Sequence, residues 1–252
     1  MHILLTGHRG YIGSHLLKRL QKKNSVVGID LQDDPIRHDL ATCELNETFD
    51  LIIHLAGKSG VRNSMADPAG YWKNNVEVSK RLFARYPNTR ILYASSSSAY
   101  EPDLNPYAAS KYLIEENAER YVDTLGMRIH TVYDDKPRKG MFIQKYLDNQ
   151  LEYVTNHYRD FIHVEDVCDA IELLINSRYS GTVDIGTGKP FRVRDFAPDV
   201  PIRLNTPYER VWTCANMERM KTLGFKPKHS VEKLLTNNKL DNIIKFNNGD
   251  TL

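Results

Sequence analysis

The fold is indicated by one segment near the N-terminus, Ile3-Leu4-Leu5-Thr6-Gly7-His8-Arg9-Gly10-Tyr11-Ile12-Gly13. Its aliphatic start predicts a strand over 3–6, and the apolar spacing that follows predicts a helix over 11–23. Between them, Gly7, Gly10 and Gly13 stand three residues apart. Such a loop lets backbone N–H groups approach phosphate oxygens, and the helix N-terminus adds a favourable dipole. The three glycines alone leave a ligand-free turn open, because similar motifs also occur without a ligand.

Short aliphatic runs alternate with amphipathic stretches, which predicts βαβ units and a parallel sheet. Further strands are expected at 26–30, 51–56, 90–95 and 128–132, and further helices at 68–86 and 107–125. Right-handed crossovers would place the loops after the strands along one carboxyl edge, where ligands bind in such sheets. We therefore predict an α/β fold, a Rossmann-type doubly wound parallel sheet with a smaller C-terminal substrate lobe.

The pattern loosens after Asp134. Shorter helices are expected at 141–147, 164–176, 217–223 and 231–245, with a short strand at 182–186. We assign residues 1–135 to a dinucleotide-binding Rossmann domain. Residues 136–252 are assigned to a smaller substrate-binding lobe, part of which packs back on the first domain.

The composition of the 252 residues is that of an ordinary globular protein, with 41% hydrophobic and 26% charged residues. A formal net charge of +2 gives no global signal for nucleic acid or an anionic membrane. The cysteines, at 43, 168 and 214, have no metal-ligand spacing, so no metal is expected. The apolar runs are too short to span a bilayer, and the N-terminus does not resemble a signal peptide. We expect a cytoplasmic enzyme.

Asp30 ends the second expected strand. A carboxylate there can accept both hydroxyls of the adenosine ribose and would repel a 2′-phosphate. No arginine follows directly, since the next residues are Leu31-Gln32-Asp33-Asp34, so NAD is favoured over NADP. Asp39 and Leu40 are candidates for contact with the adenine, although an ordinary loop explains Asp39 equally well.

Tyr107-Ala108-Ala109-Ser110-Lys111 places a phenol and an ammonium on one helix face, at positions i and i+4. A free phenol, with a pKa of about 10, is no base at neutral pH, whereas a nearby ammonium and an oxidised nicotinamide would favour phenolate. Ser96 ends a strand and is placed to hydrogen-bond the same substrate oxygen. Each feature alone is common in helices or loops. Their order on this scaffold predicts proton transfer at an alcohol.

A family resemblance is carried by segments 6–16, 50–57 with Asn74-Asn75-Val76, 93–100, 106–111, 159–167 and 223–227. In these segments the chain resembles the extended short-chain dehydrogenases/reductases, specifically the nucleotide-sugar epimerase and dehydratase group. Within this group the resemblance is greatest to enzymes that interconvert UDP-glucose and UDP-galactose at C4.

The resemblance implies roles for the matching positions. Tyr107 would be the base, Lys111 would bind the nicotinamide ribose and tune Tyr107, and Ser96 would orient the substrate oxygen. Besides Asp30, Asp39 and Leu40, the implied cofactor contacts are Gly7, Gly10, Tyr11, Ile12, Gly13, Leu55, Ala56, Gly57, Asn75, Tyr107 and Lys111. The implied substrate contacts are Ser96, Thr131, Arg159 and Arg210.

Arg159 would meet the substrate diphosphate, although a salt bridge with Asp160 or another carboxylate is the plainer interpretation of that residue by itself. Three departures from the family pattern also matter. The segment between Ser96 and Tyr107 is short, Thr131 replaces an asparagine that would contact phosphate, and Arg210 is only a candidate for the second phosphate. They predict a more open pocket.

The expected activity is therefore NAD-dependent C4 epimerisation of a nucleotide-diphosphate hexose, most simply UDP-glucose/UDP-galactose, through a 4-keto intermediate. An NADPH-consuming nucleotide-sugar reductase is one alternative, and Asp30 counts against it. A 4,6-dehydratase would want an acid pair, which Ser97-Ser98 do not supply. A non-catalytic dinucleotide-binding protein would not need Ser96, Tyr107 and Lys111 together. The resemblance implies a homodimer through helices 68–86 and 107–125, while the residues leave a monomer open.

Overall fold

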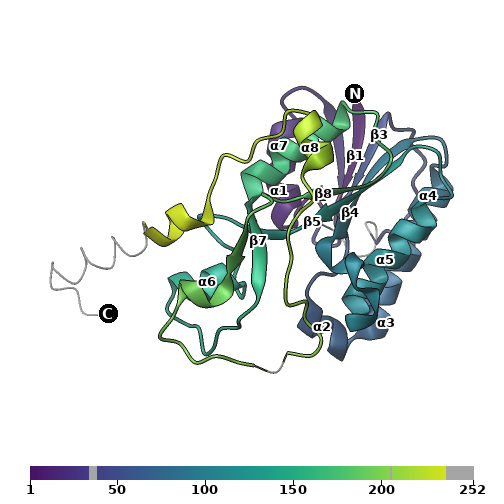
Figure 1. Cartoon of the computed structure of the whole chain (residues 1–252). Coiled ribbons are helices and arrows are strands. Elements are labelled where there is room, and N and C mark those ends of the chain that lie inside the picture. Colours follow the sequence, from purple (N-terminus) through teal and green to yellow (C-terminus); the bar gives the residue numbers. More distant parts are fainter. Residues whose placement is uncertain (34–38, 205, 237–252) are drawn as a thin grey trace.

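Six parallel strands form the main sheet of the computed structural model, in the order β2-β1-β3-β4-β5-β8 (Figure 1). They are β1 (His2–Thr6), β2 (Ser25–Ile29), β3 (Leu51–His54), β4 (Arg90–Ser96), β5 (Thr124–Ile129) and β8 (Gly181–Ile185). The structure describes residues 1–33, 39–204 and 206–236. Every residue of β3 is buried, as expected for a central strand covered on both faces. The predicted Rossmann-type parallel sheet is confirmed.

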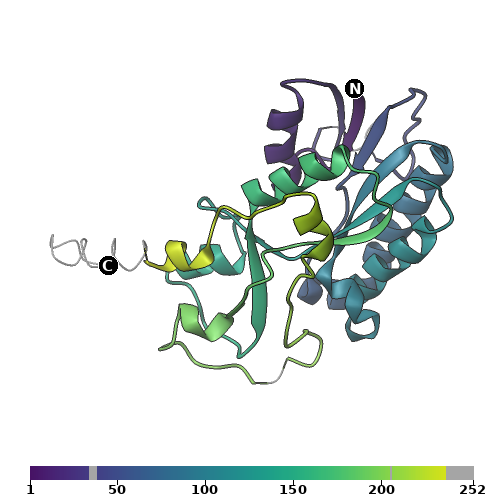
Figure 2. The same cartoon turned by 45° about the horizontal axis from the view of Figure 1, so that its top comes forward.

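Helices cover both faces of this sheet (Figures 1 and 2). One layer holds α1 (Tyr11–Leu20), α7 (Val164–Ile175) and α8 (Glu218–Thr222). The other holds α3 (Pro68–Tyr71), the π-helical segment η1 (Trp72–Glu77), α4 (Val78–Arg85) and α5 (Pro106–Ala118). Because α1 is amphipathic, its Leu16 and Leu20 pack in one hydrophobic core cluster. On the other face, Leu82 and Phe83 of α4 pack in a second cluster.

A second, three-stranded sheet lies beside the main one, with β6 (Thr131–Tyr133), β7 (Tyr158–His163) and β9 (Pro190–Arg192) in that order. Together with α6 (Phe142–Leu147) and the 3-10 turn η4 (Val193–Phe196), it encloses its own aromatic core around Phe161 and Phe196. Strand β8 and helix α7, from the same half of the sequence, belong to the main sheet and its helical layer. The assignment of residues 136–252 to one substrate lobe stays a prediction.

Several predicted boundaries were wrong. The strand expected at 128–132 is two strands in different sheets, because His130 donates its N–H to Ile185 O (2.9 Å) where the chain leaves the main sheet. The helix expected at 107–125 ends at Ala118, where Thr124 Oγ1 donates to Ala118 O and starts β5. The helix expected at 68–86 contains the π-helical segment η1. Of the helix expected at 231–245, residues 231–236 are helical and the rest lie outside the described residues.

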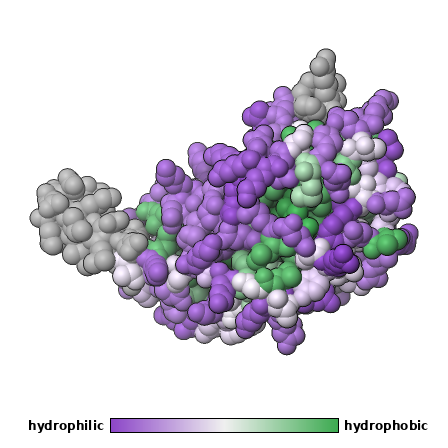
Figure 3. Space-filling view, turned by 90° about the horizontal axis from the view of Figure 1, so that it is seen from above, coloured by the Kyte–Doolittle hydropathy of each residue, from purple (hydrophilic) through white to green (hydrophobic). Residues whose placement is uncertain are grey.

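In the described part of the chain, no helix is both long and apolar enough to cross a membrane. The face shown in Figure 3 is largely polar, with small apolar areas between polar side chains.

Asp160 joins the two sheets. Its side chain lies within β7 and is fully buried. One carboxylate oxygen accepts hydrogen bonds from the N–H and hydroxyl of Thr187 (2.8 and 2.6 Å), and the other accepts from Gly188 N (2.8 Å) and Ala215 N (2.9 Å). A buried carboxylate needs such donors to offset its desolvation. Asp160 therefore fixes the loop after β8 and the segment around residue 215 against β7.

We expect Asp160→Asn to lower the free energy of unfolding by about 2–4 kcal/mol, because an amide NH2 would face N–H donors in a buried site. Urea denaturation measures this change. The matched control is Asp123→Asn, whose carboxylate is 46% exposed and pairs with Arg90; because this carboxylate is partly solvated, the substitution should cost no more than about 1 kcal/mol. Equal effects of the two substitutions would contradict the role given to Asp160.

Candidate active site

The glycine loop between β1 and α1 packs directly on the turn after β3. Gly7 has φ +72°, and a Cβ there would lie 2.6 Å from Ala56 N. A Cβ on Gly13 would lie 2.1 Å from Gly7 O. Among the described residues no side chain caps α1 at Gly10, so the N–H groups of its first turn, from Tyr11 to Gly13, are open to an anion. This cradle fits a dinucleotide pyrophosphate.

Asp30 lies just after β2, and its carboxylate also braces the glycine loop. One oxygen accepts from Arg9 N and the other from Gln32 N, both at 3.0 Å. The Asp39 carboxylate accepts from Ala41 N (2.9 Å), which makes a local turn, and Leu40 packs in the core cluster beneath. The expected contacts of Asp39 and Leu40 with adenine stay predictions, and the structure gives both residues a role in the fold.

A buried chain of hydrogen bonds connects β1, β3 and η1. Thr6 Oγ1 binds His54 Nδ1 (2.7 Å) and accepts from Ala56 N (3.2 Å). His54 Nε2 binds Ser79 Oγ (2.9 Å), which donates to Asn75 O. Burial, together with the positive charge of Lys111, lowers the pKa of His54 to about 3. The imidazole is therefore neutral, and the chain holds Leu55 and Ala56 in place without charge.

Asn75 is fully buried on η1 and locks the turn at Gly57 to α5. Its Oδ1 accepts from Lys58 N (2.7 Å), and its Nδ2 donates to Lys58 O (3.0 Å) and Ser110 Oγ (2.9 Å). Segments of π-helix are rare and often occur at functional sites. Here the segment brings Asn75 to the turn, and the side chain positions Gly57 for the expected cofactor.

Helix α5 carries the two residues expected to move the proton. Asn105 caps it, accepting from Ala108 N (2.8 Å), and Pro106 opens the first turn. Burial raises the pKa of Tyr107 above its ordinary value, and a hydrogen bond with Ser96 lowers it. Burial outweighs the effect of Ser96 in the chain alone, and the expected lowering by Lys111 together with an oxidised nicotinamide stays a prediction.

Lys111 is 6% exposed, and its Nζ donates to Ala94 O (2.7 Å). Burial lowers the pKa of its ammonium to about 8, and the nearby Glu115 carboxylate acts in the opposite direction. Glu115 is itself held by a bidentate pair with Arg128 (2.9 and 2.7 Å). At neutral pH Lys111 is therefore mostly protonated and supplies a positive charge beside Gly57.

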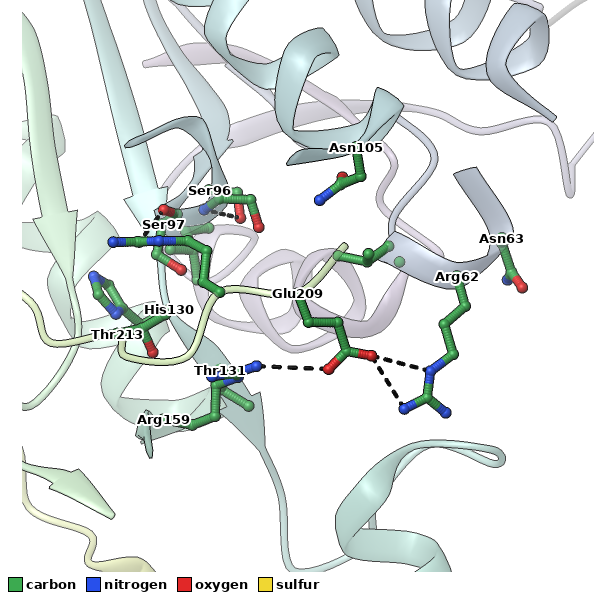
Figure 4. A pocket seen from close by; sticks show the side chains of 15 residues that line it. Arg62, Asn63, Ser96, Ser97, Asn105, His130, Thr131, Arg159, Glu209 and Thr213 are labelled. Carbon is green, nitrogen blue, oxygen red and sulfur yellow. Dashed lines mark hydrogen bonds and ion pairs between the residues drawn. The ribbon is translucent and has the colours of Figure 1, made fainter. Parts of the chain in front are cut away.

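A cavity of about 370 Å³ lies beyond the ends of β4 and β5 (Figure 4). All four predicted substrate residues line it, namely Ser96, Thr131, Arg159 and Arg210. Arg62, Asn105, His130, Glu209 and Thr213 also line it and were missed, because nothing in their local sequence distinguishes them from surface residues. Only the fold brings them together.

The short segment between Ser96 and Tyr107 forms two 3-10 turns, η2 (Ser97–Tyr100) and η3 (Pro102–Leu104). Segment 208–213 is tied to it by direct hydrogen bonds. Arg210 Nη1 donates to Ser97 O and Nε donates to Glu101 Oε1, both at 2.6 Å. Asn105 Nδ2 donates to Tyr208 O (3.0 Å). The shortened segment and segment 208–213 thus share the wall of the cavity.

Arg159 is largely buried beside this wall. It donates to Tyr158 O (2.9 Å) and to His157 Nδ1 (3.0 Å), and Glu209 Oε2 lies 3.7 Å away. Burial lowers the pKa of its guanidinium, and Glu209 opposes that shift. The salt bridge considered from the sequence exists with Glu209, whereas Asp160 binds the donors of other segments.

Comparison with known proteins gives consistent matches. The sequence model of the NAD dependent epimerase/dehydratase family matches residues 3–186. Protein CapI of Staphylococcus aureus is 30% identical, over 81% of this chain and 80% of CapI. A putative UDP-glucose 4-epimerase of Methanocaldococcus jannaschii is 27% identical, over 89% of this chain and 93% of that protein. The solved structure of MoeE5 in complex with UDP-glucose and NAD superposes with a TM-score of 0.81 at 28% identity, covering 94% of this chain and 96% of MoeE5.

The burial of Lys111 predicts that its ammonium titrates near pH 8, whereas solvated lysines titrate at about 10.4. NMR of lysine side chains labelled with ¹³C and ¹⁵N measures the midpoint, with Lys111→Arg identifying the resonance by its loss. Since the folded chain holds this proton less tightly than the unfolded chain, Lys111 opposes folding below about pH 8, and the penalty disappears as the pH approaches 10.5. A midpoint above 10 would contradict the argument.

Proposed function

The chain belongs to the NAD dependent epimerase/dehydratase family, and we propose that it epimerises C4 of a nucleotide-diphosphate hexose, most simply UDP-glucose/UDP-galactose. The family is NAD-dependent, so the prediction of NAD as the cofactor is confirmed. One observation carries the proposal: the predicted substrate residues Ser96, Thr131, Arg159 and Arg210 surround a single cavity, next to Tyr107.

Tyr107 takes the proton of the sugar 4-hydroxyl in this proposal and returns it at the end. Ser96 lies beside the phenol and lowers its pKa, and it orients the same oxygen of the substrate. Lys111, protonated at neutral pH, supplies the positive charge that favours phenolate. The cofactor, when bound, supplies the hydride acceptor and donor. The glycine cradle, Asp30 and the turn at Gly57 are the residues that would hold it.

Arg159 and Arg210 anchor the diphosphate, while Thr131 stands where a further polar contact is expected. Guanidinium groups suit phosphate because two N–H donors can meet two oxygens. A diphosphate anchored in this way would let the 4-keto sugar turn about its linkage and present the opposite face of C4 to the cofactor site. We expect the short segment between Ser96 and Tyr107, which forms η2 and η3, to leave room for this rotation.

The two alternative activities, reduction and dehydration of a nucleotide sugar, would each need a different residue at this site. A nucleotide-sugar reductase that consumes NADPH must accept a 2′-phosphate beside Asp30, whose charge repels it. A 4,6-dehydratase needs an acid next to Ser96, where the cavity offers Ser97 and Ser98. A putative UDP-glucose 4-epimerase among the relatives, and MoeE5 with bound UDP-glucose, support the choice of a UDP-hexose. A cytoplasmic location and a homodimer through α3, η1, α4 and α5 complete the proposal.

Purified protein incubated with UDP-galactose and no added cofactor should form UDP-glucose, because we expect the chain to hold its NAD tightly and to regenerate it in every cycle. Chromatography of the nucleotide sugars follows the conversion. If none appears even with added NAD, the choice of nucleotide or sugar is wrong. Consumption of NADPH by a 4-keto nucleotide sugar would instead favour the reductase.

Tyr107→Phe should reduce turnover by about 100- to 10,000-fold, since the substitution removes only the proton-transferring hydroxyl. NAD binding and thermal unfolding should remain those of the unaltered chain. Tyr112→Phe is the matched control, because Tyr112 lies on the same helix and is exposed. Normal turnover in Tyr107→Phe would rule out the proposed mechanism.

A further inference from the structure

Glu209 stands between two arginines at the cavity (Figure 4). Its Oε1 accepts from both Nε and Nη2 of Arg62, each at 3.2 Å. Its Oε2 lies 3.7 Å from Arg159 Nη2 and 3.6 Å from His157 Nδ1. The two arginines come from distant parts of the chain, α2 (Val61–Ala66) and β7. A single carboxylate therefore bridges two guanidinium groups.

The two arginines differ in freedom. The side chain of Arg159 is 18% exposed and that of Glu209 is 19% exposed, whereas that of Arg62 is 64% exposed. The guanidinium of Arg62 also lies over the ring of Tyr153, 5.4 Å from its centroid. The Arg159 side chain is therefore held in place by its surroundings. The Arg62 side chain is exposed to solvent, and its ion pair with Glu209 holds it at the cavity.

Arg210 is arranged differently. Its guanidinium is tied to Glu101 and to Ser97 O, and it lies over the ring of Tyr100. It contributes positive charge at a fixed place in the wall. Three arginines and Glu209 line the cavity, and Glu101 pairs with Arg210 at its edge, which leaves one positive charge in excess. Displacement of Glu209 raises the excess to two, which matches the roughly two negative charges of a nucleotide-sugar diphosphate.

We infer that Glu209 occupies the position of an anion between Arg62 and Arg159, and that Arg62 is a further substrate-binding residue, which takes hold of the diphosphate when Glu209 is displaced. A carboxylate and a phosphate present oxygen pairs of similar geometry to a guanidinium. The identity of the diphosphate as part of a nucleotide sugar rests on the proposed function. The anion site itself does not.

This arrangement gives Glu209 an effect opposite to that of a simple support. If Glu209 only positioned the arginines, its loss would weaken anion binding. As a competing internal anion it repels the ligand and must release both arginines first. Its removal therefore strengthens binding, whereas loss of Arg62 weakens it.

Calorimetry of chain saturated with NAD, titrated first with inorganic pyrophosphate and then with UDP, tests the inference. NAD keeps the glycine loop filled, so that only the cavity is probed. We expect Glu209→Gln to bind both anions about three- to tenfold more tightly, and Arg62→Met to bind them about tenfold more weakly. Arg203→Met is the matched control, because Arg203 lies over the same Tyr153 ring (4.8 Å) but does not line the cavity.

Weaker or unchanged binding in Glu209→Gln would overturn the inference, as would equal effects of Arg62→Met and Arg203→Met. Because the Arg62 side chain is exposed, Arg62→Met should fold normally. It therefore tests the site even if Glu209→Gln is too unstable to measure. Pyrophosphate binding with the expected changes, together with failure to bind UDP, would support the anion site and refute the nucleotide-sugar substrate. Absence of binding by both anions to the unaltered chain and to Glu209→Gln would overturn the inference.

Discussion

The backbone of Gly7 lies against that of Leu55 and Ala56 so closely that no Cβ can fit between them. This contact requires β1 and β3 to be neighbours in register, with Thr6 opposite His54. It also sets the place of Ala56 and Gly57, and through Asn75 the position of α5. The expected cofactor cradle and the proton-transferring helix therefore depend on one steric condition, which a single methyl group would break.

The sequence was sufficient to predict the sheet, the glycine loop and the grouping of Ser96, Thr131, Arg159 and Arg210, because each follows from local periodicity or from a matching motif. Helix ends were less predictable. Residues 119–123 continue a helical pattern, yet pairing of Thr124 in β5 ends the helix earlier. Arg62 and Glu209 were missed because their meaning comes from a contact between segments 147 residues apart. Such a contact has no local signature.

Burial has opposite consequences for the two reacting side chains. It raises the pKa of the Tyr107 phenol and lowers that of the Lys111 ammonium. Both shifts favour the neutral forms, so the chain alone does not create a phenolate. Ser96 works against this trend at Tyr107, and Glu115 does so at Lys111. The site is thus arranged so that added positive charge, rather than the protein's resting electrostatics, would activate the phenol.

The neutral imidazole of His54 makes the hydrogen bonds around it insensitive to pH. With a pKa of about 3, this ring keeps the same protonation state from mildly acidic to alkaline solution. The chain of hydrogen bonds from Thr6 through Ser79 to Asn75 stays unchanged while Lys111 titrates. These hydrogen bonds therefore keep the glycine loop and α5 at the same separation across the working pH range. A change of activity with pH would then originate in the groups on either side of them.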